Sequence, residues 1–401
     1  MTLFNIILMK TNKTYPKTYE EACNTTNTFW NTQPMPNINE FVTTCGRIEP
    51  NKQLIELQQL QYNIHNDFIW STIDFTNQLQ LEELTNFLNQ YYLNNVSNKF
   101  KSYYTPEFIK WVFNNDNISI AIRNKKNNIL VGFIGATITL NHFKIETINS
   151  ADVNFLCVHP KLRNKKMASL LIKELIRRVQ LKGCFQGVFM TDRYIPKPIA
   201  TNKYYHRAID INHLIKTGFT NVQNNTRVTD IEQAISLPNN PYNKYFAPLC
   251  EEDINDVCEL LNQYLTKYSF YTLFSEEQFK NIFYNNNIVT TYVLKNIDGD
   301  ILDMISYYIL PYRVNNSDVY IKTAYLFYYT SVNETPYRLI KDIIIVAKQN
   351  GIQLFTASNI MENDEVIHDL NFEQGVRSCN YYMYNWKCPN LNTNQIAKIF
   401  I

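Results

Sequence analysis

A pattern of strand, loop, helix, glycine and strand occurs twice in this chain, and it limits the possible folds more than any other feature. In its first copy, the nearly continuous apolar run at residues 153–159 is typical of a strand buried on both faces. Apolar residues then recur at helical spacing over residues 167–182, until Gly183 ends the helix. A second strand follows at residues 185–191, which completes one α/β unit.

The second copy of the pattern lies in the C-terminal half of the chain. It begins with a strand-like run at residues 324–332, and a helix follows that we expect to start at Pro336 with Thr335 as its N-cap. Gly351 ends this helix, and a strand at residues 352–358 comes next. Two copies of one pattern predict two related α/β halves in a single chain.

Length, charge and glycine content exclude several classes of protein. With 401 residues, the chain is expected to contain two or three domains. Its formal net charge of +2 lacks the basic excess of a non-specific nucleic-acid binder. Only 9 glycines are present, and neither GxGxxG nor GxxxxGK[ST] occurs. These absences exclude a Rossmann dinucleotide site and a P-loop, so any phosphate must be bound in another way.

The cysteines and the apolar runs indicate where the protein acts. Its 8 cysteines form no CxxC pair and no metal-ligand spacing, so we expect reduced thiols and no metal site. The apolar run at the N-terminus is too short for a secretory signal and lacks a basic flank. No stretch approaches the ~18 apolar residues of a membrane-spanning helix. The sequence therefore predicts a soluble, cytoplasmic protein.

The loop between the first strand and its helix is rich in positive charge. It carries Lys161, Arg163, Lys165 and Lys166, whereas the equivalent loop at residues 333–336 has no basic residue. Cations at a helix N-terminus oppose the helix dipole by about 0.3–1 kcal/mol each, so four of them favour a bound anion. We interpret the loop as a phosphate or pyrophosphate site. The alternative is a charged loop whose side chains point into water.

Seven short motifs in the chain point to one family. They are FWNTQP at residues 29–34, YTPEF at 104–108, NFLCVHPKLRNKKMA at 154–168, PKP at 196–198, KYYHR at 203–207, IMEN at 360–363 and YYMYNWKCP at 381–389. Together they resemble the eukaryotic-type N-myristoyltransferases, the glycylpeptide N-tetradecanoyltransferases. The resemblance covers roughly residues 27–401.

The resemblance implies a particular fold and division of the chain. The fold is α/β (α+β), with two tandem acetyltransferase-like (GNAT) halves in a pseudo-twofold relation. We expect an N-terminal extension at residues 1–26, an acyl-CoA-binding half at 27–237 and a C-terminal half at 238–401 that binds peptide. A connector rich in Asn, Pro and Tyr at residues 238–248 joins the halves. Members of the family lead us to expect a monomer.

The resemblance also implies that myristoyl-CoA is the co-substrate, with no prosthetic group and no metal. Its contacts are implied for the FW pair, the FLCV strand and the basic loop, which agrees with the anion site inferred from charge. The corresponding residues are Phe29, Trp30, Phe155, Leu156, Cys157, Val158, Arg163, Asn164, Lys165, Lys166, Met167 and Ala168.

The family reaction transfers myristate from the thioester to the α-amino group of an N-terminal glycine. This amine must lose a proton before it attacks, because an α-ammonium has a pKa of about 8 and no lone pair. The resemblance implies an oxyanion hole from the backbone amides of Phe155 and Leu156 at a β-bulge, with Thr191 near the amine. It assigns the base to the carboxylate of Ile401. The apolar chain end IFI favours this independently, since a carboxylate drawn into an apolar site has a raised pKa.

Five residues resemble the family's peptide groove: Tyr104, Tyr204, His206, Tyr325 and Asn359. The chain contains 28 tyrosines, so plain packing is an equally good reading for any one of them. A structural histidine is likewise the more common role for a residue such as His206.

The chain departs from the family where substrate choice is expected to be set. Residues 94–97 read NNVS where the family has acidic residues, and Asp192 and Arg193 replace the last two residues of a TAG motif. Val376 and Arg377 follow Gly375 in place of the family's GDG, and the long basic N-terminal extension is missing. The absence of carboxylates at residues 94–97 leads us to expect a weaker preference for basic peptides than in the family, and Asp192 and Arg193 are expected to place larger charged groups beside the glycine pocket.

Two other functions remain open from the sequence. One is a related acyltransferase with a different acyl chain or a lysine acceptor. The other is a non-catalytic module that binds acyl-CoA or peptide, in which Asp192 and Arg193 have altered the glycine pocket. The apolar chain end favours an enzyme, because a binding module has no need of a free C-terminus.

Overall fold

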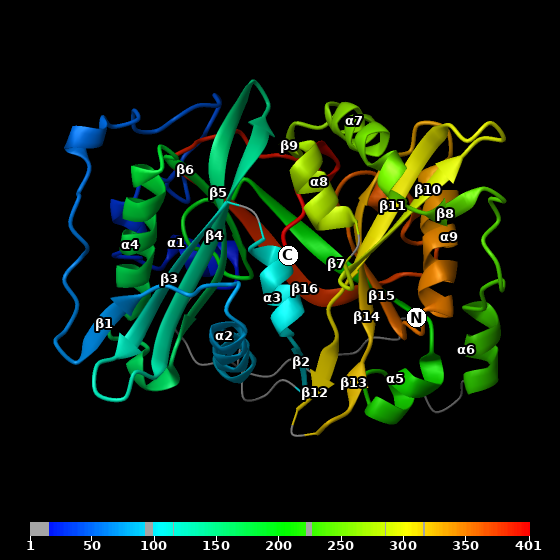
Figure 1. Cartoon of the computed structure of the whole chain (residues 1–401), viewed down its shortest axis with the longest axis horizontal. Helices are drawn as coiled ribbons and strands as arrows, with labels where there is room; N and C mark the ends of the chain where they lie inside the picture. The colour runs from blue at the N-terminus through cyan, green and yellow to red at the C-terminus, as the bar shows by residue number, and fades with distance from the viewer. Residues whose placement is uncertain (1–15, 93–98, 115, 222–226, 285, 316) are drawn as a thin grey trace.

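The computed structural model describes residues 16–92, 99–114, 116–221, 227–284, 286–315 and 317–401, arranged around one large sheet (Figure 1). In these residues the sheet has 14 strands, and its main path runs β1-β3-β4-β5-β6-β16-β7-β15-β14-β11-β10-β8. Strands β9 and β17 pair with each other beside this path, and β9 also pairs with β4. A small second sheet has the order β13-β12-β2.

The strands are β1 Phe68–Ser71, β2 Phe100–Ser102, β3 Asn117–Asn124, β4 Leu130–Phe143, β5 Glu146–Val158, β6 Gln186–Thr191, β7 Ala200–Ala208, β8 Phe246–Pro248, β9 Phe270–Leu273, β10 Val289–Lys295, β11 Ile301–Ile309, β12 Tyr312–Val314, β13 Tyr320–Ile321, β14 Thr323–Tyr329, β15 Leu354–Ser358, β16 Glu373–Tyr384 and β17 Ile396–Ala397. The α-helices are α1 Tyr19–Cys23, α2 Gln78–Tyr91, α3 Pro106–Val112, α4 Met167–Leu181, α5 Ile211–Thr217, α6 Val228–Ala234, α7 Ile254–Leu265, α8 Glu276–Phe283, α9 Pro336–Gln349 and α10 Asn363–Val366.

The repeated sequence pattern folds into two parallel β-α-β units, as predicted. The first unit is β5-α4-β6 and the second is β14-α9-β15, and in each the two strands pair in parallel. Thr335 caps α9, because its Oγ1 accepts a hydrogen bond from the N–H of Arg338 at 3.4 Å. The fold class of two tandem α/β halves is therefore confirmed.

In both units the parallel strands pair at one end and then part. The register of β5 with β6 covers only three residues and ends at Asp152 opposite Val188, although β5 continues to Val158 and β6 to Thr191. The register of β14 with β15 also covers three residues and ends at Tyr325. The sheet is therefore open between the C-terminal parts of β5 and β6, next to the basic loop.

Strands from the two halves interleave at the centre of the sheet. The late strand β16 pairs with β6 on one side and with β7 on the other, and β7 pairs with β15 (Figure 1). One continuous sheet thus joins both halves, and the division at residues 237/238 stays a prediction. The expected irregular connector at residues 238–248 ends in the short strand β8, which pairs with β10 at the edge of the sheet.

Helix α4 covers β3, β4 and β5 with the apolar face that its sequence spacing predicts. Met167, Leu171, Leu175 and Val179 are buried in one cluster with residues of these strands, while Leu170 is half-buried. A larger cluster contains Phe155 and extends into the C-terminal half. In the described part of the chain, no helix is long and apolar enough to cross a membrane.

The chain ends in the middle of the molecule (Figure 1). Strand β17 pairs in parallel with β9, and it stops at Ala397, so the last four residues form no strand. Phe400 is buried, and Ile399 and Ile401 are half-buried against the larger core cluster. The apolar chain end is therefore packed inward, as its composition predicts, although its last four residues lie beyond strand β17.

The fold predicts that Gly135 on β4 cannot be enlarged. An added Cβ would overlap the ring of Phe113, whereas a Cβ at Gly187 would meet its nearest atoms at 3.5 Å. Gly135→Ala should lower the free energy of unfolding in urea by about 1–3 kcal/mol, because the core has no room for the methyl group. Gly187→Ala is the matched control and should cost clearly less. Equal losses for the two variants would contradict this account of the packing.

Candidate active site

Strand β5, which carries the FLCV motif at residues 155–158, contains a β-bulge at Phe155 and Leu156. Gly135 and Phe133 of β4 pair with the residues on either side of the bulge, so Phe155 and Leu156 face the single residue Ile134. Phe155 has a φ of 58°, which is uncommon for a residue with a side chain. A bulge interrupts the strand ladder and redirects backbone groups. The geometry that the resemblance implies at this point is therefore present.

Packing of an aromatic ring holds the unusual backbone of Phe155 in place. Its side chain is 3% exposed, and its ring centroid lies 5.4 Å from Tyr92, 5.2 Å from Tyr104 and 5.9 Å from Phe113. A left-handed non-glycine residue costs about 1–3 kcal/mol, so it persists only where its surroundings fix it. Leu156 is 36% exposed, which places the two bulge residues in different environments.

The basic loop after β5 leads into a helix N-terminus without a side-chain cap. Asn164 and Lys166 both have positive φ, 62° and 59°, and Lys166 precedes α4 without capping it. Lys161, Lys165 and Lys166 are exposed, and none of them has an acidic partner within 4.0 Å in the described residues. Uncapped N–H groups with cations around them favour a bound anion, and an anion site at this loop stays a prediction.

Arg163 differs from the three lysines, because its guanidinium is held by main-chain carbonyls. Its Nε donates to the oxygen of Val158 at 3.1 Å, and its Nη2 donates to the oxygen of Tyr91 at 2.7 Å. These bonds connect the end of β5 with the end of α2. The side chain therefore fixes the loop, and its role in binding an anion stays a prediction.

The FW motif lies against β6, far from its own position in the sequence. Trp30 begins a short 3-10 helix, and its ring stacks on Phe189 of β6 at 5.3 Å. Phe189 in turn stacks on Tyr382 of β16 at 5.2 Å, and Phe29 contacts Trp30 edge-on at 5.1 Å. The structure thus places the predicted pair Phe29 and Trp30 beside the strand that parts from β5.

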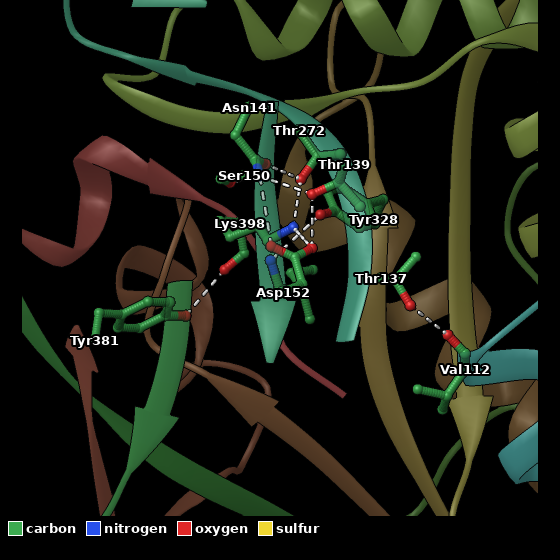
Figure 2. Close-up of polar contacts among 11 residues, drawn as sticks. Val112, Thr137, Thr139, Asn141, Ser150, Asp152, Thr272, Tyr328, Tyr381 and Lys398 are labelled. Atoms are coloured by element: carbon green, nitrogen blue, oxygen red, sulfur yellow. Dashed lines mark hydrogen bonds and ion pairs between the residues drawn. The ribbon is translucent and has the colours of Figure 1, made fainter. Parts of the chain in front are cut away.

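The C-terminal residues are bonded to β14 and β16, and β16 pairs with β6, the strand that carries Thr191. Tyr381 of β16 donates through its hydroxyl to the main-chain oxygen of Lys398 (Figure 2), at 3.0 Å. The N–H of Ile399 donates to the hydroxyl of Tyr328 at 3.3 Å. The neighbour of Tyr381, Asn380, pairs with Thr191 at the end of β6. The chain end and Thr191 therefore meet the same strand, β16.

The predicted peptide residues fall into two places. Four of them, Tyr204, His206, Tyr325 and Asn359, lie on β7 and β14 and directly after β15. Their strands are neighbours, since β15 pairs with both β14 and β7. Asn359 extends the ladder, because its Oδ1 accepts from the N–H of Lys203 at 2.8 Å.

Tyr104 lies beside the bulge instead, and aromatic contacts connect it to the other group. Ring centroids are 5.8 Å apart for Tyr104 and Phe108, 6.4 Å for Phe108 and Tyr308, and 5.1 Å for Tyr308 and Tyr325. The Tyr325 hydroxyl donates to that of Tyr312 at 2.8 Å. A chain of aromatic side chains thus runs from the bulge at Phe155 to the predicted peptide residues.

Arg377, one of the departures from the family's motifs, lies on β16 near His206 of β7. Between Gln374 and Ser378 the register of β16 with β7 shifts, so the intervening Arg377 stands on a bulge. His206 is buried and bonded to the Oγ1 of Thr356 at 2.9 Å. Burial first, and the charge of Arg377 second, lower the pKa of His206 to about 4. His206 is therefore neutral at pH 7.

The other departures are exposed or lie outside the described part of the chain. Asp192 and Arg193 form an ion pair with each other at 3.8 Å, with side chains 47% and 44% exposed. The main-chain oxygen of Arg193 accepts from the hydroxyl of Tyr382 at 3.0 Å. Residues 94–97 are outside the described residues. Within those residues, no cluster of His, Cys, Asp and Glu could hold a metal ion.

Two models of one protein family match most of the chain. The N-terminal domain of myristoyl-CoA:protein N-myristoyltransferase matches residues 47–202. The C-terminal domain of the same family matches residues 216–399. The two matches follow each other in the order of the two α/β halves.

Curated proteins and solved structures agree with this match. Glycylpeptide N-tetradecanoyltransferase 2 of Danio rerio is 33% identical over 390 residues, which are 96% of this chain and 79% of the relative. Glycylpeptide N-tetradecanoyltransferase of Plasmodium falciparum is 34% identical over 386 residues, 93% of each chain. Crystal structures of Saccharomyces cerevisiae N-myristoyltransferase with bound myristoyl-CoA superpose with a TM-score of 0.88 at 26% identity, covering 94% of this chain and 95% of that chain.

The lowered pKa of His206 should make the free energy of unfolding decrease at acidic pH. Its pKa is about 4 in the folded chain but about 6.5 when unfolded, so the unfolded state binds more protons between these pH values. The free energy of unfolding should therefore fall by about 3 kcal/mol as the pH drops through this window. His206→Gln should remove most of this slope in urea titrations. The same slope in His206→Gln as in the wild type would contradict the assignment, and the exposed His65→Gln is the control.

Proposed function

This chain belongs to the family of myristoyl-CoA:protein N-myristoyltransferases, and we propose that it transfers myristate from myristoyl-CoA to an N-terminal glycine of protein substrates. The chain is an acyltransferase. The observation that carries the proposal is the bulge at Phe155, beside strands that part and a basic loop, within a fold that both family domains match.

Myristoyl-CoA is proposed to lie where β5 and β6 separate. The N-terminus of α4, with Lys161, Lys165 and Lys166 around it, would bind the CoA phosphates. Trp30, stacked on β6, and its neighbour Phe29 would contact the same molecule from the other side of the opening. The support for this arrangement is that both sets of residues border one gap in the sheet.

The chemical step is proposed to be a direct attack of the glycine amine on the thioester carbon. The bond to nitrogen forms while the carbonyl oxygen becomes negative, and the amides of Phe155 and Leu156 would stabilise this oxyanion. The C–S bond then breaks, and CoA leaves as its thiol. Thr191, at the end of β6, would orient the amine. Backbone donors suit this task, because the bulge fixes them before the substrate arrives.

The base is proposed to be the C-terminal carboxylate of Ile401. It would first take the proton that the glycine ammonium loses and release it to solvent. After the attack the nitrogen loses a second proton, which the carboxylate would pass to the leaving thiolate. The support is the inward course of the chain end, where Phe400 is buried and its ring centroid lies 5.7 Å from that of Tyr381.

Three other features remain predictions: the division of the chain at residues 237/238, a cytoplasmic location and a monomeric state.

Incubation of the untagged protein with myristoyl-CoA and a peptide that starts with glycine tests this function. Mass spectrometry should find one C14 acyl group on the glycine nitrogen, and none on a peptide in which alanine replaces the glycine. Acylation of a lysine side chain, or transfer of another acyl chain only, would indicate a related acyltransferase. Tight binding of myristoyl-CoA without any transfer would indicate a binding module.

Extension of the chain beyond Ile401 tests the proposed base. Two added glycines remove the carboxylate from its place, so kcat should fall by about 10²–10⁴-fold, the usual contribution of a general base. Binding of myristoyl-CoA, measured by calorimetry, should be unchanged, since its proposed site is elsewhere. The control carries the same extension at the N-terminus. Full activity of the C-terminally extended protein would exclude the carboxylate as the base.

Arg377 provides a test of substrate charge. A cation near the predicted peptide residues should repel lysine and arginine of a substrate, so kcat/KM should not rise when basic residues are added downstream of the glycine. Arg377→Gly should raise kcat/KM for basic peptides about 5-fold or more relative to neutral ones. A strong, salt-sensitive preference of the wild type for basic peptides would contradict this expectation.

A further inference from the structure

A buried ion pair joins the C-terminal segment to the strand that carries the bulge. The ammonium of Lys398 contacts the Oδ2 of Asp152 (Figure 2). The two residues are 4% and 8% exposed. The same ammonium donates to the Oγ1 of Thr272 at 2.9 Å. Asp152 also accepts a hydrogen bond from the hydroxyl of Thr139 at 2.8 Å. Both charges are therefore removed from water and held by several partners at once.

The polar side chains around the pair come from neighbouring strands of the sheet. Asn141 of β4 donates through Nδ2 to Thr139 at 2.7 Å and to Ser150 at 2.8 Å, and its Oδ1 accepts from Thr272 of β9 at 2.7 Å. The pair thus belongs to a closed network, in which each member restricts the others (Figure 2). Residue 398 can contact Asp152 only in the geometry that this network allows.

The ion pair lies at a particular point of the sheet, where β5 and β6 separate. Asp152 is the last residue of β5 that pairs with β6, so the ion pair lies at the point where the two strands part. Phe155 of the bulge follows three residues later on β5, and Ile401 follows three residues after Lys398. Three extended residues span at most about 10–11 Å. The pair therefore limits how far the chain end can lie from the bulge.

Energetics also favour a positioning role over a stabilising one. Two buried opposite charges often contribute no more to stability than well-packed apolar side chains, because both lose their hydration. Their best-attested benefit is to select one arrangement among several. Here the selected arrangement is the path of the last residues, which are also held by Tyr381 and Tyr328.

We infer that the Lys398–Asp152 ion pair is a positioning device that sets the C-terminal carboxylate against the acyl-transfer bulge. This inference rests on the proposed function, in which Ile401 supplies the base. Lys398 and Asp152 do not contact the substrate in this account. They act through the carboxylate, and so their loss should slow the chemical step while leaving myristoyl-CoA binding intact.

The double variant Lys398→Met with Asp152→Asn tests the inference, because it removes both charges and leaves no unpaired ion in the core. We expect kcat for a glycine peptide to fall by about 10- to 100-fold, as a small misplacement of a catalytic group does. The Kd of myristoyl-CoA and the KM of the peptide should stay at their wild-type values. Lys398→Arg keeps the charge and should retain most of kcat.

A second ion pair of the same chemistry serves as the matched control. Lys295 and Asp253 are 2.7 Å apart, and they join the start of α7 to β10, which pairs with β11 and β8 and not with the strands that hold the chain end. Lys295→Met with Asp253→Asn should leave kcat unchanged. If the main double variant does not fold, Thr272→Val removes one partner of the ammonium without removing a charge. Its kcat should then fall while myristoyl-CoA binding persists.

The outcomes separate this inference from the proposed function. A wild-type protein that acylates glycine, with a double variant of equal kcat, would overturn the positioning role alone. The same would follow if the control pair lowered kcat as much as the Lys398–Asp152 pair. A wild-type protein without any transfer activity would overturn the proposed function and the positioning role together.

Discussion

The separation of β5 from β6 after Asp152 is the constraint on which the rest of the site depends. Parallel strands that part leave a gap in the sheet, and the fold places a different component at each border of this gap. The bulge and the basic loop follow on β5, and Trp30 stacks on β6. The C-terminal segment meets the gap where it begins, through Lys398. A single divergence of two strands therefore brings together segments from both ends of the chain.

Two features that cost free energy, a strained backbone and a buried ion pair, persist at this gap because the surrounding side chains hold them in place. Phe155 keeps a positive φ, and the rings of Tyr92, Tyr104 and Phe113 enclose its side chain. The Lys398–Asp152 pair keeps two charges away from water within a closed set of hydrogen bonds. Both lie within a few residues of each other on β5. Strain and buried charge at one place are typical of a site that is organised before its substrate binds.

Much of the fold follows from local sequence signals. The apolar run on β5, the spacing of Met167, Leu171 and Val179 on α4, and the Thr335 cap of α9 each predict their elements correctly, because they depend on neighbours in the chain. The interleaving of β16 between β6 and β7 could not be predicted, since strand order depends on contacts between distant segments.

The site shows the same division between local and distant information. The anion-binding role of the basic loop could be predicted from its positive charge alone. The bulge was implied by the resemblance of residues 154–158 to the family's motif. The Lys398–Asp152 pair was missed, because a lysine near the end of the chain gives no signal of a partner 246 positions away. Arg377 was noted only as a departure from a motif. Its position near His206 depends on a register shift between β16 and β7, which no local sequence pattern predicts.

A crystal structure of the untagged protein with a non-hydrolysable myristoyl-CoA analogue and a glycine peptide would test the central claim most directly. The account predicts the phosphates at the N-terminus of α4 and the acyl carbonyl oxygen within hydrogen-bond distance of the amides of Phe155 and Leu156. It also predicts the Ile401 carboxylate within reach of the glycine nitrogen, directly or through one water. An acyl chain bound outside the gap between β5 and β6, or a chain end turned away from the amine, would contradict it.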